Sequence, residues 1–289
     1  MHTPIEISEK AVRKLQKTNA DCVVALGGGS TTGLGKAIAL RTGVPQIVIP
    51  TTYAGSEVTP ILGETEAGVK RTLRSPDVLP ETVIYDVDLT MSLTVPLTVT
   101  SGINAMAHAV EALYAKDGNP VTSLLAEQGI TAMSKALPQI CQDPANKAAR
   151  THALYAAWAC GTCLGTVGMA LHHKLCHTLG GAFNLPHSET HTVVLPYAIA
   201  FNCRAAPESM HTIARALGVE DPARGMYELA KSLGAVTSLR ELGMAESAIE
   251  EATDLAMANP YWNPEPLTRD SIRLLLRQAY AGESPRSLR

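Results

Sequence analysis

Histidines are concentrated in one short stretch of this sequence. Five of the nine histidines fall between residues 172 and 191. His173 and His177 are four residues apart, so a helix would place them on one face about a turn apart. A glycine pair and a proline follow, and they would turn the chain so that His187 folds back toward the other two. Such a cluster can hold zinc or iron, or it can transfer protons and orient a substrate without a metal.

A second polar stripe lies upstream, in an apolar segment that reads as a helix. Asn104 and His108 are four residues apart, and Glu111 continues the same face. A lone histidine in such a segment is most often a hydrogen-bonded core residue, and that interpretation is kept for the isolated histidines elsewhere. The repeated four-residue spacing favours a functional site for this group instead.

A run of three glycines stands between a strand-like segment and a helix-like segment. In Gly27-Gly28-Gly29-Ser30, the missing side chains let backbone N–H groups approach a pyrophosphate, and the start of the helix favours an anion. The run is neither a GxGxxG fingerprint nor a P-loop, so a tight strand-to-helix turn is the alternative. A second loop at 50–57, rich in hydroxyl groups, follows the next strand. Ligands bind beyond the carboxyl ends of strands in an open parallel sheet. The candidate cofactor-binding residues are therefore Gly27, Gly28, Gly29, Ser30, Thr51, Thr52 and Ser56.

The first third of the chain is predicted to be α/β. Strand, helix and strand with short joints are typical of a parallel sheet with right-handed crossovers. Two alternating runs around a glycine-containing turn at 61–73 predict a hairpin. Strands are expected at 22–26, 46–50 and 83–86, and helices at 10–17 and 32–42.

From about residue 96 onward the apolar period changes to that of helices. The sequence thus predicts two domains: an α/β dinucleotide-binding domain over 1–95, built on a parallel sheet, and an all-α substrate and catalytic domain over 96–289. Helices are expected at 102–115, 121–140, 147–170, 171–181, 207–217, 221–233, 236–242, 246–257 and 267–280.

The composition excludes several classes of partner. A formal net charge of −3 gives no general attraction to nucleic acid or to an anionic membrane, and two Trp and two Phe are too few for a single-strand stacking platform. No run has the length of a transmembrane helix, and the first residues do not form a signal peptide. The six cysteines are interpreted as buried, reduced thiols, despite the redox spacing of Cys160 and Cys163. We therefore expect a cytoplasmic protein that binds neither nucleic acid nor membrane.

These motifs together resemble those of the iron-type (group III) alcohol dehydrogenase superfamily. The resemblance covers residues 22–202 and rests on Gly-Gly-Gly-Ser, Pro-Thr-Thr-x-x-Gly-Ser-Glu, the pair that ends in His108, and His173-x3-His177-x9-His187. The segments 107–115, 172–177 and 259–264, with the second loop, are similar to the maleylacetate reductase branch. This resemblance implies reduction of maleylacetate to 3-oxoadipate with NADH or NADPH in aromatic compound degradation, and a homodimer.

The resemblance also implies a metal-free site. Metal-dependent members carry Asp-x3-His followed by two further histidines, whereas this sequence has Asn104 in place of the aspartate. A neutral amide contributes no charge to hold a divalent cation, so no metal is expected. Any metal would have His108, His173 and His187 with Asn104 as its ligands. Lys36 is retained in the helix after the glycine run and joins the candidate cofactor residues, while Gly33 replaces an acidic residue of many relatives.

Roles in a reductase follow from the same resemblance. His108, His173 and His187 would polarise the substrate carbonyl by hydrogen bonding, and His177 would act as an acid or an orienting group. Lys174 is a candidate for a substrate carboxylate and completes the predicted catalytic set. The adjacent residues Lys70 and Arg71 are weaker candidates for binding a substrate carboxylate, since solvated surface charge is the favoured interpretation for them.

Two alternatives stay open. One is a metal-dependent alcohol or polyol dehydrogenase of the same superfamily. The other is an N-terminally truncated, non-catalytic fragment. This alternative arises because the superfamily's nucleotide domain opens with a strand–helix–strand unit. No counterpart of that unit is found before the first strand expected here. Met1 is therefore interpreted as an internal methionine of a longer parent.

Overall fold

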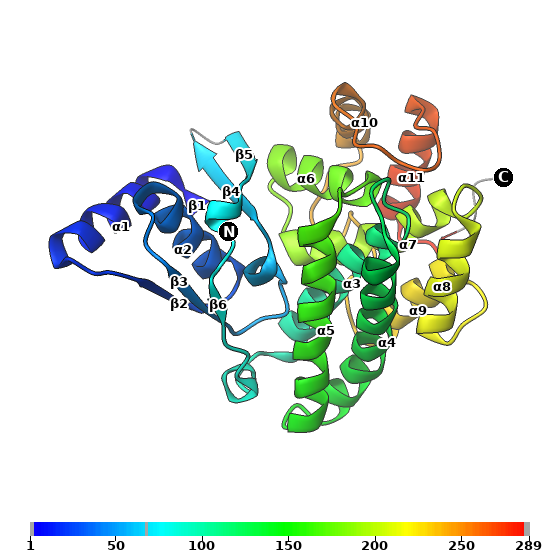
Figure 1. Cartoon of the computed structure of the whole chain (residues 1–289). Coiled ribbons are helices and arrows are strands. Elements are labelled where there is room, and N and C mark those ends of the chain that lie inside the picture. The colour runs from blue at the N-terminus through cyan, green and yellow to red at the C-terminus, as the bar shows by residue number, and fades with distance from the viewer. Residues whose placement is uncertain (1–2, 67–68, 286–289) are drawn as a thin grey trace.

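The structure, a computed structural model, describes residues 3–66 and 69–285. An α/β part at the N-terminal end lies beside a larger helical part that contains the rest of the chain (Figure 1). This arrangement confirms the predicted fold class, in which a parallel sheet with helices precedes an all-helical region.

A three-stranded parallel sheet forms the base of the α/β part. β2 (Val23–Gly27), β3 (Gln46–Pro50) and β6 (Thr82–Val83) pair in the order β2-β3-β6. Gly27 at the end of β2 pairs with Pro50 at the end of β3. The loops that follow these two strands therefore start at the same edge of the sheet.

Two helices cover this sheet from one side. α2 (Gly29–Thr42) follows β2 directly and contacts both β2 and β3, while α1 (Ile5–Thr18) packs on α2. Both helices begin earlier than expected, by five residues for α1 and three for α2. Because α2 starts within the glycine run, at Gly29, its first N–H groups lie at the edge where the two loops emerge.

A second three-stranded sheet connects the two parts of the molecule. β1 (Thr3–Pro4) pairs with β4 (Ile61–Glu66), and β4 pairs antiparallel with β5 (Val69–Arg74), which confirms the hairpin predicted at 61–73. The hairpin lies between α2 and α6 (Figure 1). The Arg74 guanidinium donates a hydrogen bond to the carbonyl oxygen of Gly165, so the hairpin contacts the helical part directly.

α3 (Val95–Leu113) is the central helix of the helical part. All its residues from Thr98 to Ala112 are buried, because α4 and α5 pack against it together with α7. Its polar side chains must therefore find partners inside the protein or in a bound ligand. The other helices are α4 (Pro120–Gln142), α5 (Lys147–Thr166), α6 (Leu171–Phe183), α7 (His187–Asn202), α8 (Pro207–Leu217), α9 (Pro222–Ser232), α10 (Ala248–Ala258) and α11 (Arg269–Ala281).

Two helix predictions are wrong. α7 was not expected, because it is buried on every side from Thr190 to Asn202 and so has no amphipathic period, and because Pro196 lies inside it. The helix expected at 236–242 is a turn. The Leu239 amide donates to the Ala279 carbonyl of α11 instead of to a preceding turn of its own segment.

The composition predicts buried, reduced thiols at the six cysteines. Cys160, Cys163 and Cys176 are free and buried as expected, but Cys22 is exposed just before β2.

Within the described ranges, no single helix is long and apolar enough to cross a membrane. α5 and α6 pass that test only as a pair, and the pair is bent by 94°.

Candidate active site

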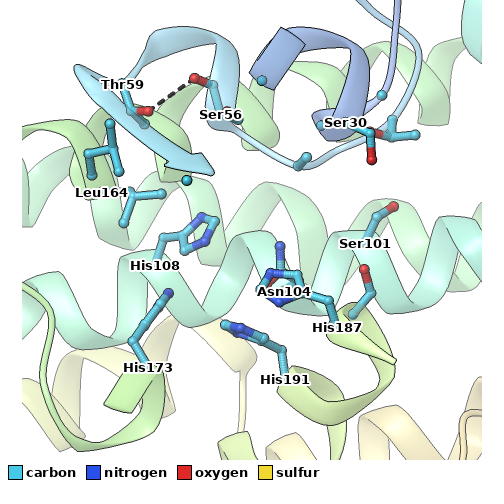
Figure 2. Close-up of a pocket in the computed structure, with 18 of the residues that line it drawn as sticks. Ser30, Ser56, Thr59, Ser101, Asn104, His108, Leu164, His173, His187 and His191 are labelled. Carbon is cyan, nitrogen blue, oxygen red and sulfur yellow. Dashed lines mark hydrogen bonds between the residues drawn. The ribbon is translucent and has the colours of Figure 1, made fainter. Parts of the chain in front are cut away.

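A cavity of about 610 Å³ lies where the loops of the α/β part face α3, α6 and α7. On one side it is lined by residues of 28–31 and 52–59, called the loop wall below. On the other side it is lined by Ser101, Asn104, His108, His173, His177, His187 and His191, called the histidine wall. Figure 2 shows the two walls opposite each other, with Ser30, Ser56 and Thr59 above and the histidines below.

The loop wall is made of backbone and small side chains. A Cβ on Gly28 would lie 3.0 Å from Cγ2 of Thr52, and one on Gly29 would lie 3.5 Å from Cβ of Ala54. A side chain on Gly28 would therefore crowd Thr52, whereas a methyl group on Gly29 would make ordinary contact with Ala54. Gly28 is the N-cap of α2 and has no side chain with which to cap the helix, so the first N–H groups of α2 are available to an anion.

Not every predicted cofactor residue reaches the cavity. Gly28, Gly29, Ser30, Thr52 and Ser56 line it, whereas Gly27, Lys36 and Thr51 are not among the described residues that do. The Thr51 amide donates to the Gly27 carbonyl over 3.0 Å and ties the two loops together behind the wall.

Lys36 is corrected from a cofactor ligand to a residue that holds a loop. Its side chain is fully buried, and Nζ donates to the carbonyl oxygens of Ser56, Thr59 and Ile61 at 2.6, 2.6 and 2.8 Å, and to Oγ1 of Thr59 at 2.9 Å. Burial lowers the pKa of Lys36 to about 7, against the opposing effect of the Glu57 carboxylate. Its donors are thus used on the backbone that carries Ser56 into the cavity.

The loop wall is seated on α5 by two glycines. Gly55 has a φ of +75°, and a Cβ there would lie 2.9 Å from Cα of Gly161, while a Cβ on Gly161 would lie 2.6 Å from the Gly55 carbonyl oxygen. Backbones can approach this closely only where both residues lack side chains. The contact fixes the loop above His108, whose Nδ1 would be 3.5 Å from the same Gly55 Cβ.

The histidine wall comes from three helices. Ser101, Asn104 and His108 line the cavity from α3 at three- and four-residue spacing, as one helix face requires. The ring centroids of His108 and His173 are 5.2 Å apart, and those of His173 and His177 are 6.1 Å apart. The structure therefore brings together the four predicted histidines, His108, His173, His177 and His187, with Asn104 beside them.

Burial keeps much of this wall uncharged. The pKa of His108 lies well below its usual range, first because of burial and then because of the neighbouring histidines, and the same causes act on His172 and His191. Buried polar atoms at the wall include Nε2 of His173, Nε2 of His191 and Oδ1 of Asn104, which have no hydrogen-bond partner in the protein. Such atoms are normally satisfied, so they indicate where a ligand would bind.

Sequence reasoning missed His191 and Tyr261 as residues of the site. His191 lines the cavity, and its Nδ1 lies 3.0 Å from Nε2 of His172. Tyr261 also lines the cavity, and its hydroxyl lies 3.1 Å from Nδ1 of His177. Glu111, which the sequence placed on the stripe with His108, contacts His173 from behind the wall. The histidine run and the motif at 259–264 held the signal for His191 and Tyr261, but spacing alone could not show that the segment before α11 returns to α6.

Lys174, predicted to bind a substrate carboxylate, is not among the described residues that line the cavity. Its Nζ lies 5.9 Å from the ring centroid of Tyr261, and partial burial lowers its pKa. Lys174 therefore contacts a residue of the site and not the cavity itself. The side chains of the pair at 70–71 lie outside the described part of the structure.

The donor set at this wall does not fit an iron centre. Non-haem iron is commonly held by histidines together with a carboxylate, and here Asn104 offers a neutral amide beside His108, His173 and His187. The carboxylate of Glu111 is occupied, because it accepts hydrogen bonds from two backbone amides and lies 2.8 Å from Nδ1 of His173. Elsewhere in the described ranges, ligand atoms of His172, Cys176 and His191 lie within 4.8 Å of one another, with the His172–His191 pair at hydrogen-bond distance.

Comparisons with known proteins agree with this geometry. The model of the iron-containing alcohol dehydrogenases matches residues 1–87, and the C-terminal model of the Fe-containing alcohol dehydrogenase family matches residues 98–280. Maleylacetate reductases of Rhizobium sp. (strain MTP-10005) and Burkholderia cepacia are 57% and 58% identical, and each match covers 99% of this chain and 81% of the relative.

Solved structures give the same result. The crystal structure of maleylacetate reductase from Rhizobium sp. strain MTP-10005 superimposes with a TM-score of 0.95 at 57% identity, over 99% of this chain and 81% of that one. A putative alcohol dehydrogenase from Ralstonia eutropha JMP134 superimposes with a TM-score of 0.97 at 58% identity and the same coverage. The chain belongs to the iron-containing alcohol dehydrogenase family, in the branch that holds the maleylacetate reductases.

Proposed function

We propose that this chain is an NADH- or NADPH-dependent reductase that converts maleylacetate to 3-oxoadipate. The observation that carries the proposal is a single cavity with a glycine-rich helix start on one wall and buried imidazoles on the other. Relatives named maleylacetate reductase that are 51–58% identical over 99% of the chain support the choice of substrate.

The loop wall would bind the cofactor through backbone. The pyrophosphate is assigned to the first turn of α2 at Gly28, Gly29 and Ser30, with the side chains of Thr52 and Ser56 facing it across the narrow gap between the loops. When bound, the nicotinamide supplies a hydride to one carbon of the substrate double bond.

The histidine wall would stabilise the charge that this addition creates. The double bond of maleylacetate is conjugated with a ketone, so hydride addition moves negative charge onto the ketone oxygen. The imidazole N–H groups of His108, His187 and His191, which line the cavity, are assigned to donate to that oxygen, and each such donor is typically worth about a hundredfold in rate. The proton for the other carbon is assigned to His177, which the Tyr261 hydroxyl holds at Nδ1.

The substrate carboxylates would be bound mainly by neutral donors. None of the described residues that line the cavity is a lysine or an arginine. Ser101 and Ser188 line it together with the histidines, so hydroxyl and imidazole groups are the available partners. A role for Lys174 at the edge of this site stays a prediction.

The proposed enzyme works without a metal, because Asn104 removes the anionic ligand and no step above needs a cation. Its dimeric state also stays a prediction, which light scattering of the purified protein would check. The decisive assay follows NADH oxidation with maleylacetate, with and without EDTA, beside a panel of short aldehydes.

Turnover of maleylacetate that EDTA does not change is the expected result. Turnover of aldehydes but not maleylacetate, with loss of activity in EDTA, would establish the alternative, a metal-dependent alcohol dehydrogenase. A protein that neither turns over nor quenches NADH fluorescence at millimolar cofactor would be the non-catalytic fragment.

A further inference from the structure

Glu111 is a carboxylate buried behind the histidine wall. It lies on α3 one turn after His108, and its side chain is inaccessible to solvent. Oε1 accepts a hydrogen bond from the His172 amide at 2.6 Å. Oε2 accepts one from the Ala170 amide at 2.7 Å and lies 2.8 Å from Nδ1 of His173. Both carboxylate oxygens are therefore occupied by groups of the protein itself.

These contacts assign the hydrogen on the His173 ring. Two of the three groups that face Glu111 are backbone amides, which can only donate, and an ionised carboxylate can only accept. The third contact is satisfied when Nδ1 of His173 carries the hydrogen. The ring then presents Nε2 to the cavity, where this atom is buried and has no partner in the protein. Figure 2 shows His173 extended toward the space between the walls.

The same carboxylate fixes the start of α6. Ala170 is the N-cap of this helix and makes no side-chain capping bond. Glu111 supplies the missing acceptor from a different helix, because it binds the amides of residues 170 and 172. One side chain thus sets both where α6 begins and how the His173 ring is turned.

Two other histidines of the wall contact neutral groups. His177 is paired with the phenol of Tyr261, and His191 with the neutral imidazole of His172. His173 is held by a carboxylate, with its Nδ1 2.8 Å from Oε2 of Glu111. Hydrogen bonds to an ionised acceptor are shorter and roughly twice as strong as those between neutral groups. The orientation of His173 is therefore firmly fixed.

We propose that Glu111 is a positioning residue of the reductase, which acts on the reaction by holding the His173 ring with Nε2 directed at the substrate. The proposal rests on the proposed function for the reaction, but the contact on which it depends can be tested without turnover. Partners of this kind typically change activity by about 10- to 100-fold when they are replaced.

A double-mutant cycle separates positioning from folding. Glu111→Gln is expected to lower kcat with maleylacetate by about 10- to 100-fold, and to leave the NADH dissociation constant within about twofold, since Glu111 does not line the cavity. In a His173→Ala background, the same substitution should lower kcat no further, because its effect runs through the missing ring. An equal further loss in that background would show a merely structural role and overturn the proposal.

The experiment also needs a control variant and a substitute variant. Glu64→Gln removes a partly buried carboxylate that binds Ser8 and Arg41 away from the cavity, and it should keep kcat within about twofold. If Glu111→Gln does not fold, Glu111→Asp replaces it in the cycle, because it keeps the charge and shortens the reach to His173. A Glu111→Asp protein that keeps the wild-type kcat although its His173 ring has lost the wild-type orientation would contradict the proposal.

A spectrum of the 15N-labelled histidines tests the contact independently of activity. The resonance that disappears in His173→Ala should show the hydrogen on Nδ1 in the wild type, and should lose that preference in Glu111→Gln. A hydrogen on Nε2 in the wild type would overturn the proposal. If the wild type does not reduce maleylacetate, the proposed function fails, while this spectrum still decides whether Glu111 orients His173.

Discussion

The loop wall and the histidine wall face the same ligand space with different kinds of atoms. The loop wall offers backbone N–H groups and small hydroxyls, and it works because Gly28 and Gly29 have no side chains. The histidine wall offers side chains from buried helices, and three of its rings contact an orienting partner: His173 contacts Glu111, His191 contacts His172 and His177 contacts Tyr261. The loop wall thus depends on missing side chains, which expose the backbone, whereas the histidine wall depends on the imidazole side chains themselves.

The supports of the two walls differ in the same way. Lys36 holds the loop wall from behind by donating to three backbone carbonyls and to the Thr59 hydroxyl, so most of that contact is independent of the loop side chains. Glu111 holds the histidine wall by accepting from a side chain and two amides. Adding atoms should therefore damage the loop wall, while removing atoms should damage the histidine wall.

The largest effect is expected from removing an imidazole. His187→Ala should lower kcat with maleylacetate by about a hundredfold, the usual loss for one donor to a developing oxyanion. The NADH dissociation constant should stay within about twofold, because the pyrophosphate is assigned to the other wall. Steady-state kinetics and NADH fluorescence titration measure the two quantities. His152→Ala, at an exposed position of α5, is the control. A tenfold weaker NADH affinity in His187→Ala with unchanged kcat would abolish the distinction between the walls.

The opposite pattern is expected from adding atoms to the glycine run. Gly28→Val would place branched carbons in the gap where a Cβ already lies 3.0 Å from Thr52. The NADH dissociation constant should rise about tenfold or more, a loss of about 1.4 kcal/mol of binding free energy, while kcat at saturating NADH changes less. Gly181→Ala, at a helical glycine whose added Cβ meets nothing within 4 Å, should leave NADH binding unchanged. Equal losses in both variants would show general destabilisation instead.

Much of the loop wall could be predicted from the sequence because the segments that form it are close together along the chain. An apolar run, a glycine run and a helix follow one another within about twenty residues, and parallel pairing of β2 with β3 brings the second loop to the same edge. Lys36 joined the predicted cofactor residues through the resemblance to the family and not through a local pattern. The structure shows that the chain returns a loop over it at 56–61 and uses its hydrogen-bond donors there.

The histidine wall could be predicted only in part because it is formed by residues that are far apart along the chain and meet only in the folded structure. Spacing of four residues predicted the pair His173 and His177 and the stripe that includes His108. His191 was missed with the rest of α7, since a helix buried on all sides has no polar face to reveal its period. Tyr261 lies 84 residues from His177 along the chain, and no local pattern connects them.

The buried imidazoles also predict a pH-dependent stability. In the folded protein the pKa of His108, His172 and His191 lies well below 6.5, the usual value that these groups regain on unfolding. Below about pH 6.5 the unfolded chain binds protons that the folded chain does not. The stability is therefore fully present above that pH and is lost as the pH falls toward the folded-state pKa, by about 1.4 kcal/mol per pH unit for each group.

Urea unfolding at a series of pH values between about 8 and 5 measures this slope. His191→Leu removes one buried imidazole, so its free energy of unfolding should fall less steeply with acid than that of the wild type. His211→Gln, at an exposed histidine, should leave the slope unchanged. Parallel slopes for His191→Leu and the wild type would mean that the histidine wall takes up protons in the folded state.

The smallest effect is expected at the edge of the histidine wall. Lys174 lies over the Tyr261 ring at 5.9 Å and outside the described lining of the cavity. Lys174→Ala should therefore raise KM for maleylacetate by only about twofold, since an exposed cation–π contact is worth about 0.5 kcal/mol. Lys231→Ala removes a similar contact with Tyr227 far from the cavity and should leave KM unchanged. A tenfold rise in KM for Lys174→Ala would instead place its ammonium on a substrate carboxylate. The histidine wall would then need a cation that the cavity lining does not contain, and the neutral recognition proposed for the substrate would be wrong.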